Sequence, residues 1–181
     1  MRMSEFQPYG DHPRKVWRWW SGVTFDLGRP PRHNEIDPGA FIRTLHKVWL
    51  VEWLAETDSF RYRLAGEDIN RTHGFSLKDK FLDDVIPAET RPQIAAAWRR
   101  VLAEPAVSYQ TGYIYLNGQT VRKGERLLLP ILSNSTDSPA FLLGITSLAK
   151  PSELLEMESE SPQPDYTHDF FPLKDLLVKK A

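Results

Sequence analysis

The sequence contains no cysteine among its 181 residues. Disulfides, thiolate metal sites and thiol nucleophiles are therefore excluded together. The same absence excludes flavins and other chromophores that work through a cysteinyl adduct. A sizeable core can still form, because the chain has six Trp, six Tyr and nine Phe. Its length is that of one domain with appendages.

An excess of charge of one sign is also absent. The 23 Lys and Arg and the 24 Asp and Glu give a net charge of −1, and they are interspersed along the chain. No basic stripe marks a nucleic-acid or anionic-membrane partner, so neither partner is expected. The apolar runs are short and interrupted by charge, and residues 1–6 lack the apolar centre of a signal peptide. We therefore expect a soluble, cytoplasmic protein.

Spacings typical of metal ligands and catalytic groups are missing as well. The five histidines are scattered without a ligand-like spacing, which predicts no protein-bound metal. There is no Gly-x-Ser-x-Gly elbow and no phosphate-binding glycine loop. The acidic pairs 67–68 and 83–84 are adjacent in sequence and point in different directions on a helix, which indicates solvated surface. The protein is expected not to be an enzyme, although a small-ligand enzyme stays open as an alternative.

What the sequence does contain begins with a short amphipathic helix. Asp11 can cap it, Val16, Trp17 and Trp20 form an apolar stripe, and Gly22 is expected to end it. We favour burial of the two tryptophans against a sheet. The alternative is an exposed surface for a dimer or another partner.

Two strands and three short helices are expected next. A helix starting at Asp37 precedes strands over 48–54 and from Phe60, joined by a turn at 56–59 into an antiparallel hairpin. The second strand runs into a helix closed by Gly74, a position suited to a left-handed residue. Capping-box spacing from Ser76 starts another helix, and a longer one follows over 89–103.

The next part of the chain shows strand patterns. Strands are expected over 109–116, 125–132 and 141–148, with Asn117-Gly118 as a hairpin turn. Pro130 has no amide hydrogen and predicts a sheet edge or a bulge.

The C-terminal part changes in composition. Residues 150–164 are acidic and rich in Ser and Pro, which predicts a mobile linker, and residues 1–10 are expected to be a flexible N-terminus. Residues 165–181 regain an apolar stripe and form an amphipathic segment. This segment could dock on its own domain, on a second copy or on a partner groove, and the first two are favoured.

The order of elements resembles a PAS domain. The most specific parts of the resemblance are Arg63-Leu-Ala-Gly66 and Arg126-Leu-Leu-Leu-Pro130, supported by Pro31-Arg32, Asp37-Pro38 and His73-Gly74. These segments are similar to a bacterial family of stand-alone PAS proteins with a Trp-rich N-terminal helix, over residues 11–149. The resemblance implies an α+β fold with a five-stranded antiparallel sheet, short helices on one face and an N-terminal covering helix.

The resemblance also implies sensory or regulatory work. PAS domains bind small molecules or cofactors, dimerise and pass a conformational change to an output, so we expect a homodimer or a signalling partner and leave the ligand open. PAS domains that bind haem usually ligate iron with a histidine on the helix before the third strand. The helix over 89–103 has none, so haem is disfavoured.

Two arginines are the leading site candidates, because Arg63 and Arg126 lie within or beside apolar strand residues. Structurally, each could pair across the sheet with Glu52 or Glu125, and this interpretation is favoured. Functionally, an arginine with Tyr113 or His73 could orient an anionic molecule. The expected ligand-binding residues are Arg63, His73, Phe75, Phe81, Trp98, Tyr113 and Arg126. The expected interface residues are Trp17, Trp20, Phe170, Phe171 and Leu176.

Overall fold

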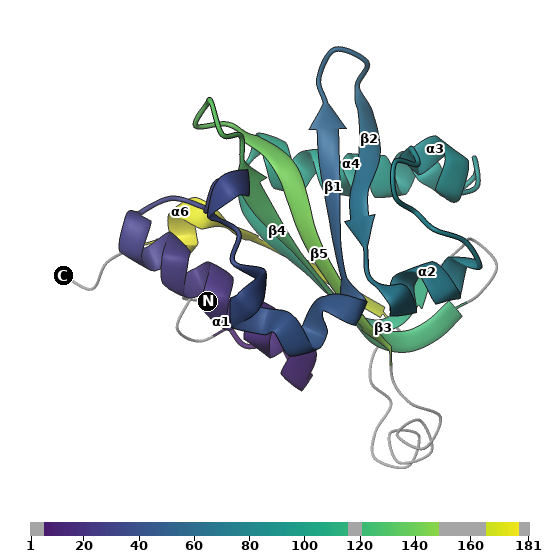
Figure 1. The fold of residues 1–181 in the computed structure, drawn as a ribbon, viewed down its shortest axis with the longest axis horizontal. Coiled ribbons are helices and arrows are strands. Elements are labelled where there is room, and N and C mark those ends of the chain that lie inside the picture. The colour runs from purple at the N-terminus through teal and green to yellow at the C-terminus, as the bar shows by residue number, and fades with distance from the viewer. Residues whose placement is uncertain (1–5, 116–120, 149–165, 178–181) are drawn as a thin grey trace.

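The computed structural model describes residues 6–115, 121–148 and 166–177, which form one antiparallel sheet with helices on both faces (Figure 1). The strand order is β2-β1-β5-β4-β3-β6. The strands are β1 (Val48–Leu54), β2 (Ser59–Ala65), β3 (Ala106–Tyr115), β4 (Val121–Leu132), β5 (Pro139–Leu148) and β6 (Tyr166–Pro172). The PAS-like α+β class is confirmed, and the sheet has six strands rather than five because the C-terminal segment adds β6.

The helices follow the expected order with two differences. They are α1 (Asp11–Leu27), η1 (His33–Glu35), η2 (Pro38–Lys47), α2 (Glu67–His73), α3 (Leu82–Val85), α4 (Arg91–Ala103) and α6 (Leu173–Leu176). The first helix passes through Gly22 and ends at Gly28, which adopts the left-handed conformation at φ 68°. The helix at 38–47 is of the 3₁₀ type.

Strand alternation divides the interior into two apolar clusters. On the face that we call the α1 side, Val16, Trp17 and Trp20 pack against alternate residues of β3, β4 and β5. On the opposite face, the helix side, Trp98 of α4 packs with Trp49 of the sheet and with residues of α3. The expected arrangement of short helices on one face and a covering N-terminal helix on the other is therefore present (Figure 1).

Glu125 of β4 fixes the start of α1. Its carboxylate accepts hydrogen bonds from the backbone N–H groups of Gly10, at 2.6 Å, and Tyr9, at 3.1 Å, and from the hydroxyl of Tyr109, at 2.6 Å. Burial raises the pKa of Glu125, although these three donors act in the opposite direction. Burial, and then the bond to Glu125, raises the pKa of Tyr109. A buried acid thus ties the N-terminus to the sheet.

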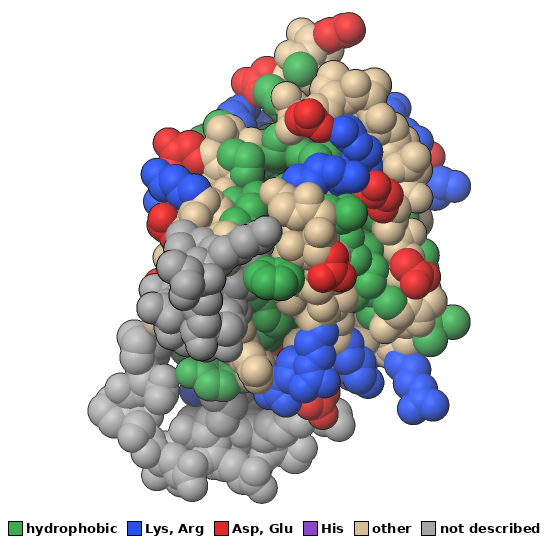
Figure 2. All heavy atoms as spheres, turned by 90° about the vertical axis from the view of Figure 1, so that its left-hand side faces the viewer, with side chains coloured by type: hydrophobic (Ala, Val, Ile, Leu, Met, Phe, Trp, Pro, Cys, Tyr) green, Lys and Arg blue, Asp and Glu red, His purple; other side chains and the backbone are tan. Residues whose placement is uncertain are grey.

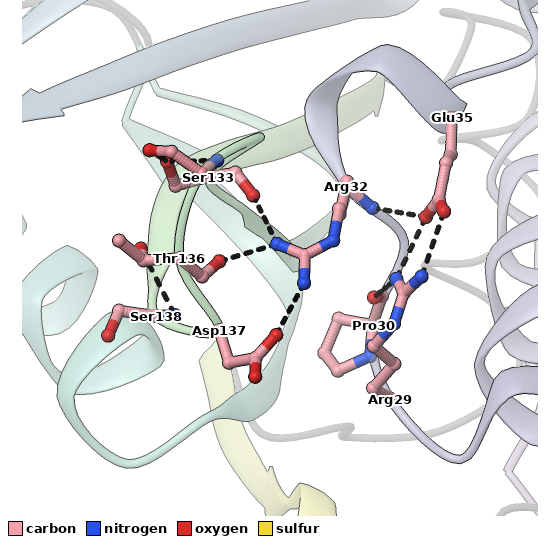
Figure 3. A network of polar contacts seen from close by, with 9 residues as sticks. Arg29, Pro30, Arg32, Glu35, Ser133, Thr136, Asp137 and Ser138 are labelled. Atoms are coloured by element: carbon pink, nitrogen blue, oxygen red, sulfur yellow. Dashed lines mark hydrogen bonds and ion pairs between the residues drawn. The ribbon is translucent and has the colours of Figure 1, made fainter.

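A second tie holds the connection after α1 to the β4–β5 loop. The Arg32 guanidinium donates to the carbonyls of Ser133, at 2.8 Å, and Thr136, at 2.6 Å, and pairs with Asp137 (Figure 3). Beside it, the carboxylate of Glu35 accepts hydrogen bonds from both terminal nitrogens of Arg29, each at 2.8 Å. These bonds lower the pKa of Glu35 to about 2. The Pro31-Arg32 motif is therefore structural.

The prediction of a sheet edge or a bulge at Pro130 is confirmed. Pairing of β3 with β4 begins at Ser108–Leu128, so Pro130 has β5 alone as a paired neighbour, and the β4–β5 register shifts after Ile131. The proline therefore removes no ladder hydrogen bond to β3.

Both ends of the described chain pack on the domain. Phe6 was expected in a flexible N-terminus, but it is 4% exposed and its ring meets Trp17, Tyr109 and Phe171 at 4.8–5.1 Å. Residues 166–177, expected as an amphipathic segment, dock on their own domain as β6 and α6, one of the arrangements left open above. The expected linker 150–164 and the turn at Asn117-Gly118 lie outside the described residues.

Replacing Glu125 with Gln should destabilise the fold. The amide nitrogen of Gln cannot accept a hydrogen bond, so at least one buried N–H or O–H donor would be left without an acceptor. We expect a loss of about 1–3 kcal/mol in the free energy of unfolding, measured by urea denaturation. Glu56→Gln, at an exposed turn position, is the control and should change stability by less than about 0.5 kcal/mol. Equal stability of both variants would contradict the role given to Glu125.

Candidate functional site

Four polar side chains lie in one row across the helix side of the sheet. Arg126 of β4 is paired with Thr146 of β5 on one side and with Gln110 of β3 on the other, and Gln110 is paired with His168 of β6. Residues in register on neighbouring strands point to the same face. We call Thr146, Arg126, Gln110 and His168 the polar row.

Hydrogen bonds connect the row to the sheet around it. The hydroxyl of Thr146 accepts from Arg126 Nε and from the indole N–H of Trp49, both at 3.1 Å. At the other end, His168 Nε2 lies 2.9 Å from the hydroxyl of Ser108, and Gln110 Nε2 lies 3.3 Å from the imidazole. The row is held in place by buried side chains at both ends, namely Trp49, Ser108 and Thr146.

The charge of Arg126 also acts on two further side chains, His73 and Tyr62. Burial, and then the positive charge of Arg126, lowers the pKa of His73 at the end of α2 to about 4. Tyr62 of β2 is buried, which raises its pKa, while Arg126 acts in the opposite direction. His73 Nδ1 is buried and has no hydrogen-bond partner in the described part of the chain.

This arrangement suits a negatively charged group. The guanidinium of Arg126 is half-buried and its positive charge acts on the imidazole of His73, so a nearby anion would favour the charged form of both groups. His73 and Arg126, two of the residues expected at a ligand site, are thus close enough for the charge of one to affect the pKa of the other. Tyr62, Gln110, Thr146 and His168 join them and were not singled out from the sequence.

Arg63 lies elsewhere. Its side chain is 42% exposed and its Nη1 lies 3.6 Å from the carboxylate of Glu52, which also accepts from Arg61 at 2.8 Å. Glu52 is paired with Phe141, which packs against the α1-side cluster. Arg63 is therefore part of a surface ion pair away from Arg126. Its partner is Glu52, one of the two carboxylates expected from the sequence.

The four aromatic residues expected at the ligand site do not share one wall. Phe75 and Phe81 are exposed, whereas Trp98 is buried and its ring meets Trp49 at 5.4 Å. Tyr113 lies opposite Lys123, whose Nζ is 5.4 Å from the ring. Lys123 and Arg126 are three residues apart on β4, so their side chains point to opposite faces of the sheet. Tyr113, paired with Lys123, therefore lies on the α1 side and away from Arg126.

The residues expected at an interface contact their own chain. Trp17 and Trp20 are almost fully buried in the α1-side cluster, and Leu176 is buried beside them. Phe171 packs on that cluster, and Phe170 packs on the helix-side cluster. On the face shown in Figure 2, hydrophobic side chains are interspersed with acidic and basic ones.

An open surface pocket lies away from the polar row, between the β1–β2 turn, α3 and α4. Its volume is about 320 Å³, and its charged lining residues are Asp58, Asp83, Arg91 and Arg99. Arg99 makes two bonds to Asp58, at 2.8 and 2.9 Å, and lowers the pKa of that carboxyl, while Arg91 pairs with Asp83 at 3.4 Å. The charges at this pocket thus neutralise one another.

The described residues contain no group of three or more His, Asp or Glu side chains placed to hold a metal ion. Among the helices of this part of the chain, none combines the length and apolar character that crossing a bilayer requires.

The sequence matches the family model of the PAS domain over residues 13–147. The chain belongs to the PAS domain family. PAS domains are sensory and signalling modules, which agrees with the sequence-based expectation. The match ends before β6, so His168 is supplied by a segment beyond the family domain.

Solved structures include a distant likeness to the chain, and no curated protein is significantly similar to it. The chain resembles a sensory box histidine kinase/response regulator from Burkholderia thailandensis at 10% identity and a TM-score of 0.40. The alignment covers 67% of this PAS domain protein and 92% of that chain.

Protonation of His73 should weaken the fold in acid. Its pKa is about 4 in the folded protein and 6.5 in a free imidazole, so the unfolded chain binds more protons between these values. Stability is then complete above pH 6.5 and falls as the pH drops towards 4. A shift of this size has an upper limit of about 3 kcal/mol, and partial exposure to solvent reduces our expectation to about 1–2 kcal/mol.

Urea denaturation at several pH values tests this expectation with His73→Gln. The variant should lose about 1–2 kcal/mol less than the wild type between pH 7 and pH 4.5. His33→Gln is the matched control, since His33 stacks on Phe141 at 4.4 Å, far along the chain from α2. If His73→Gln and the wild type have parallel stability profiles, His73 is not held neutral by its surroundings.

Proposed function

We propose that this PAS domain is a non-catalytic sensory or regulatory module that binds a small anionic molecule beside Arg126 and His73. The observation that supports this most directly is that burial and the positive charge of Arg126 both lower the pKa of His73. The buried Nδ1 of this histidine has no hydrogen-bond partner in the described residues. Buried polar atoms are nearly always hydrogen-bonded, and a bound molecule would supply a partner for this nitrogen.

A carboxylate or phosphate group fits this chemistry. It would accept charge-assisted hydrogen bonds from the guanidinium, and its negative charge would offset the positive field that lowers the pKa of His73. The imidazole could then protonate and donate to the same anion. Binding would thereby change both charge and hydrogen bonding at the end of α2, which gives the module two distinguishable states.

The output of such a module would pass through contacts with a second copy or with a signalling protein. Because α2 follows directly on edge strand β2 and contacts η2, a change at His73 could reach the surface through these elements. The sensing group and its route to the surface would then lie in the same part of the fold.

A purely structural dimerisation module is the second candidate. It is favoured by Trp98, which fills much of the helix side by packing against Trp49, Phe60 and Tyr62. Burial of Trp17 and Trp20 within the monomer argues against it, because those residues were the expected contact between copies.

Binding of simple anions to the full chain decides between these candidates. The indole N–H of Trp49 donates to the same hydroxyl as Arg126, so its NMR signal reports on the polar row. We expect acetate, succinate or inorganic phosphate to shift this signal in a saturable way. Arg126→Gln should weaken the response by about tenfold or more, since a charged hydrogen bond contributes about 1.5–3 kcal/mol.

Arg63→Gln is the matched control, because it removes a guanidinium that lies in a surface ion pair away from the row. It should leave anion binding unchanged. Native mass spectrometry of the purified wild type reports any co-purified ligand and the subunit number together. Absence of a saturable shift with all three anions, combined with a ligand-free dimer, would favour the structural module.

A further inference from the structure

The edge of β3 is covered by a segment that the family domain does not include. Strand β6 pairs antiparallel with β3 over seven residue pairs, from Ala106–Pro172 to Gly112–Tyr166. The PAS match ends at residue 147, and residues 149–165 separate β5 from this strand. We call residues 166–177 the C-terminal segment.

On the α1 side, the C-terminal segment is held by apolar contacts. Phe171 meets Phe6 at a ring distance of 4.8 Å, and Leu173 and Leu176 are buried in the same cluster. The backbone N–H of Leu173 donates to the carbonyl of Pro105 at 2.7 Å. These contacts are made by apolar side chains and a backbone hydrogen bond, and on the same face Asp169 is paired with Tyr109.

On the helix side, the contact depends on His168. Its imidazole lies between the hydroxyl of Ser108, which is fully buried, and the amide of Gln110. Its ring is 4.3 Å from that of Phe170, and Phe170 in turn lies under the guanidinium of Arg100 at 4.0 Å. His168 is thus the titratable side chain through which the described part of the segment is hydrogen-bonded to β3.

Charges around His168 oppose its protonation. Burial, followed by the positive charges of Arg100 on α4 and Arg126 on β4, lowers its pKa from 6.5, and Asp169 of the same strand acts the other way. An imidazole on an undocked segment would be in water and would lose these effects. The undocked segment therefore binds protons more readily than the docked one, and docking weakens as the pH falls below 6.5.

We propose that the edge of β3 is a strand-docking surface which the C-terminal segment occupies reversibly, and that protonation of His168 releases it. Release uncovers the backbone groups of 106–112 and the apolar surface around Phe6. An exposed strand edge beside apolar side chains is the kind of surface that accepts a strand of another chain. This device goes beyond the proposed anion binding and does not depend on it.

Hydrogen exchange of the full chain, followed by mass spectrometry between pH 7.5 and 5, tests the proposal. Peptides covering 106–112 and 166–172 are compared with β1 in the same sample, after correction for intrinsic exchange rates. We expect their protection relative to β1 to fall as the pH drops below 6.5, by up to about tenfold per pH unit. Equal relative protection at both ends of the range would overturn the proposal.

Three variants identify the responsible group. His168→Gln should remove the pH dependence, and His33→Gln should keep it. Asp169→Asn alters an exposed side chain and removes the one nearby negative charge, so it should enlarge the loss at the acid end of the range. If His168→Gln does not dock at neutral pH, Asp169→Asn still decides, because an unchanged profile in that variant would overturn the role of His168.

Anion binding and strand docking can fail separately. Loss of the Trp49 response with a normal exchange profile would remove the proposed ligand and leave docking intact. A normal Trp49 response with pH-independent exchange would remove the proposed pH-dependent docking and leave anion binding intact.

Discussion

The adjacent and oppositely charged residues Glu125 and Arg126 define the constraint on which this fold depends. Strand alternation sends their side chains to opposite faces of β4, so they cannot neutralise each other. Glu125 finds its partners in Tyr109 and in the backbone at the start of α1. Arg126 faces the helices, where its charge acts on His73, Tyr62 and His168. One dipeptide thus holds the covering helix on one face of the sheet and supplies a guanidinium to the other.

The two faces need different chemistry because each has a different cover. The α1 side is closed by tryptophans and by Phe6, and its buried carboxylate is satisfied by three donors. The helix side is closed by α3 and α4 around Trp98, and the polar row lies on the same face of the sheet. The half-buried guanidinium of Arg126 is stabilised there by dipolar partners, among them the hydroxyl of Thr146.

Much of this architecture could be read from the sequence, and the reasons are local. Period-two alternation marked β1, β2 and β3, apolar runs marked β4 and β5, and the stripe of Val16, Trp17 and Trp20 marked a helix that covers a sheet. Arg126 and His73 stood out because each combines a polar group with an apolar setting. Arg63 stood out on the same grounds but belongs to an edge strand with an exposed face. Local pattern does not report whether a helix covers the strand.

The remaining site residues depend on register between distant strands, which local pattern does not contain. Thr146, Gln110 and His168 meet Arg126 only because β5, β4, β3 and β6 pair in one particular alignment. His168 is the extreme case, since it lies 42 residues beyond Arg126 and follows a stretch of acidic, Ser- and Pro-rich composition. A shift of one residue in β6 would turn His168 towards α1 and bring Asp169 or Thr167 to the row. The chemistry of the site is therefore set by strand alignment as much as by residue type. The alignment of the C-terminal strand is the hardest to predict, because residues 149–165 separate β6 from β5.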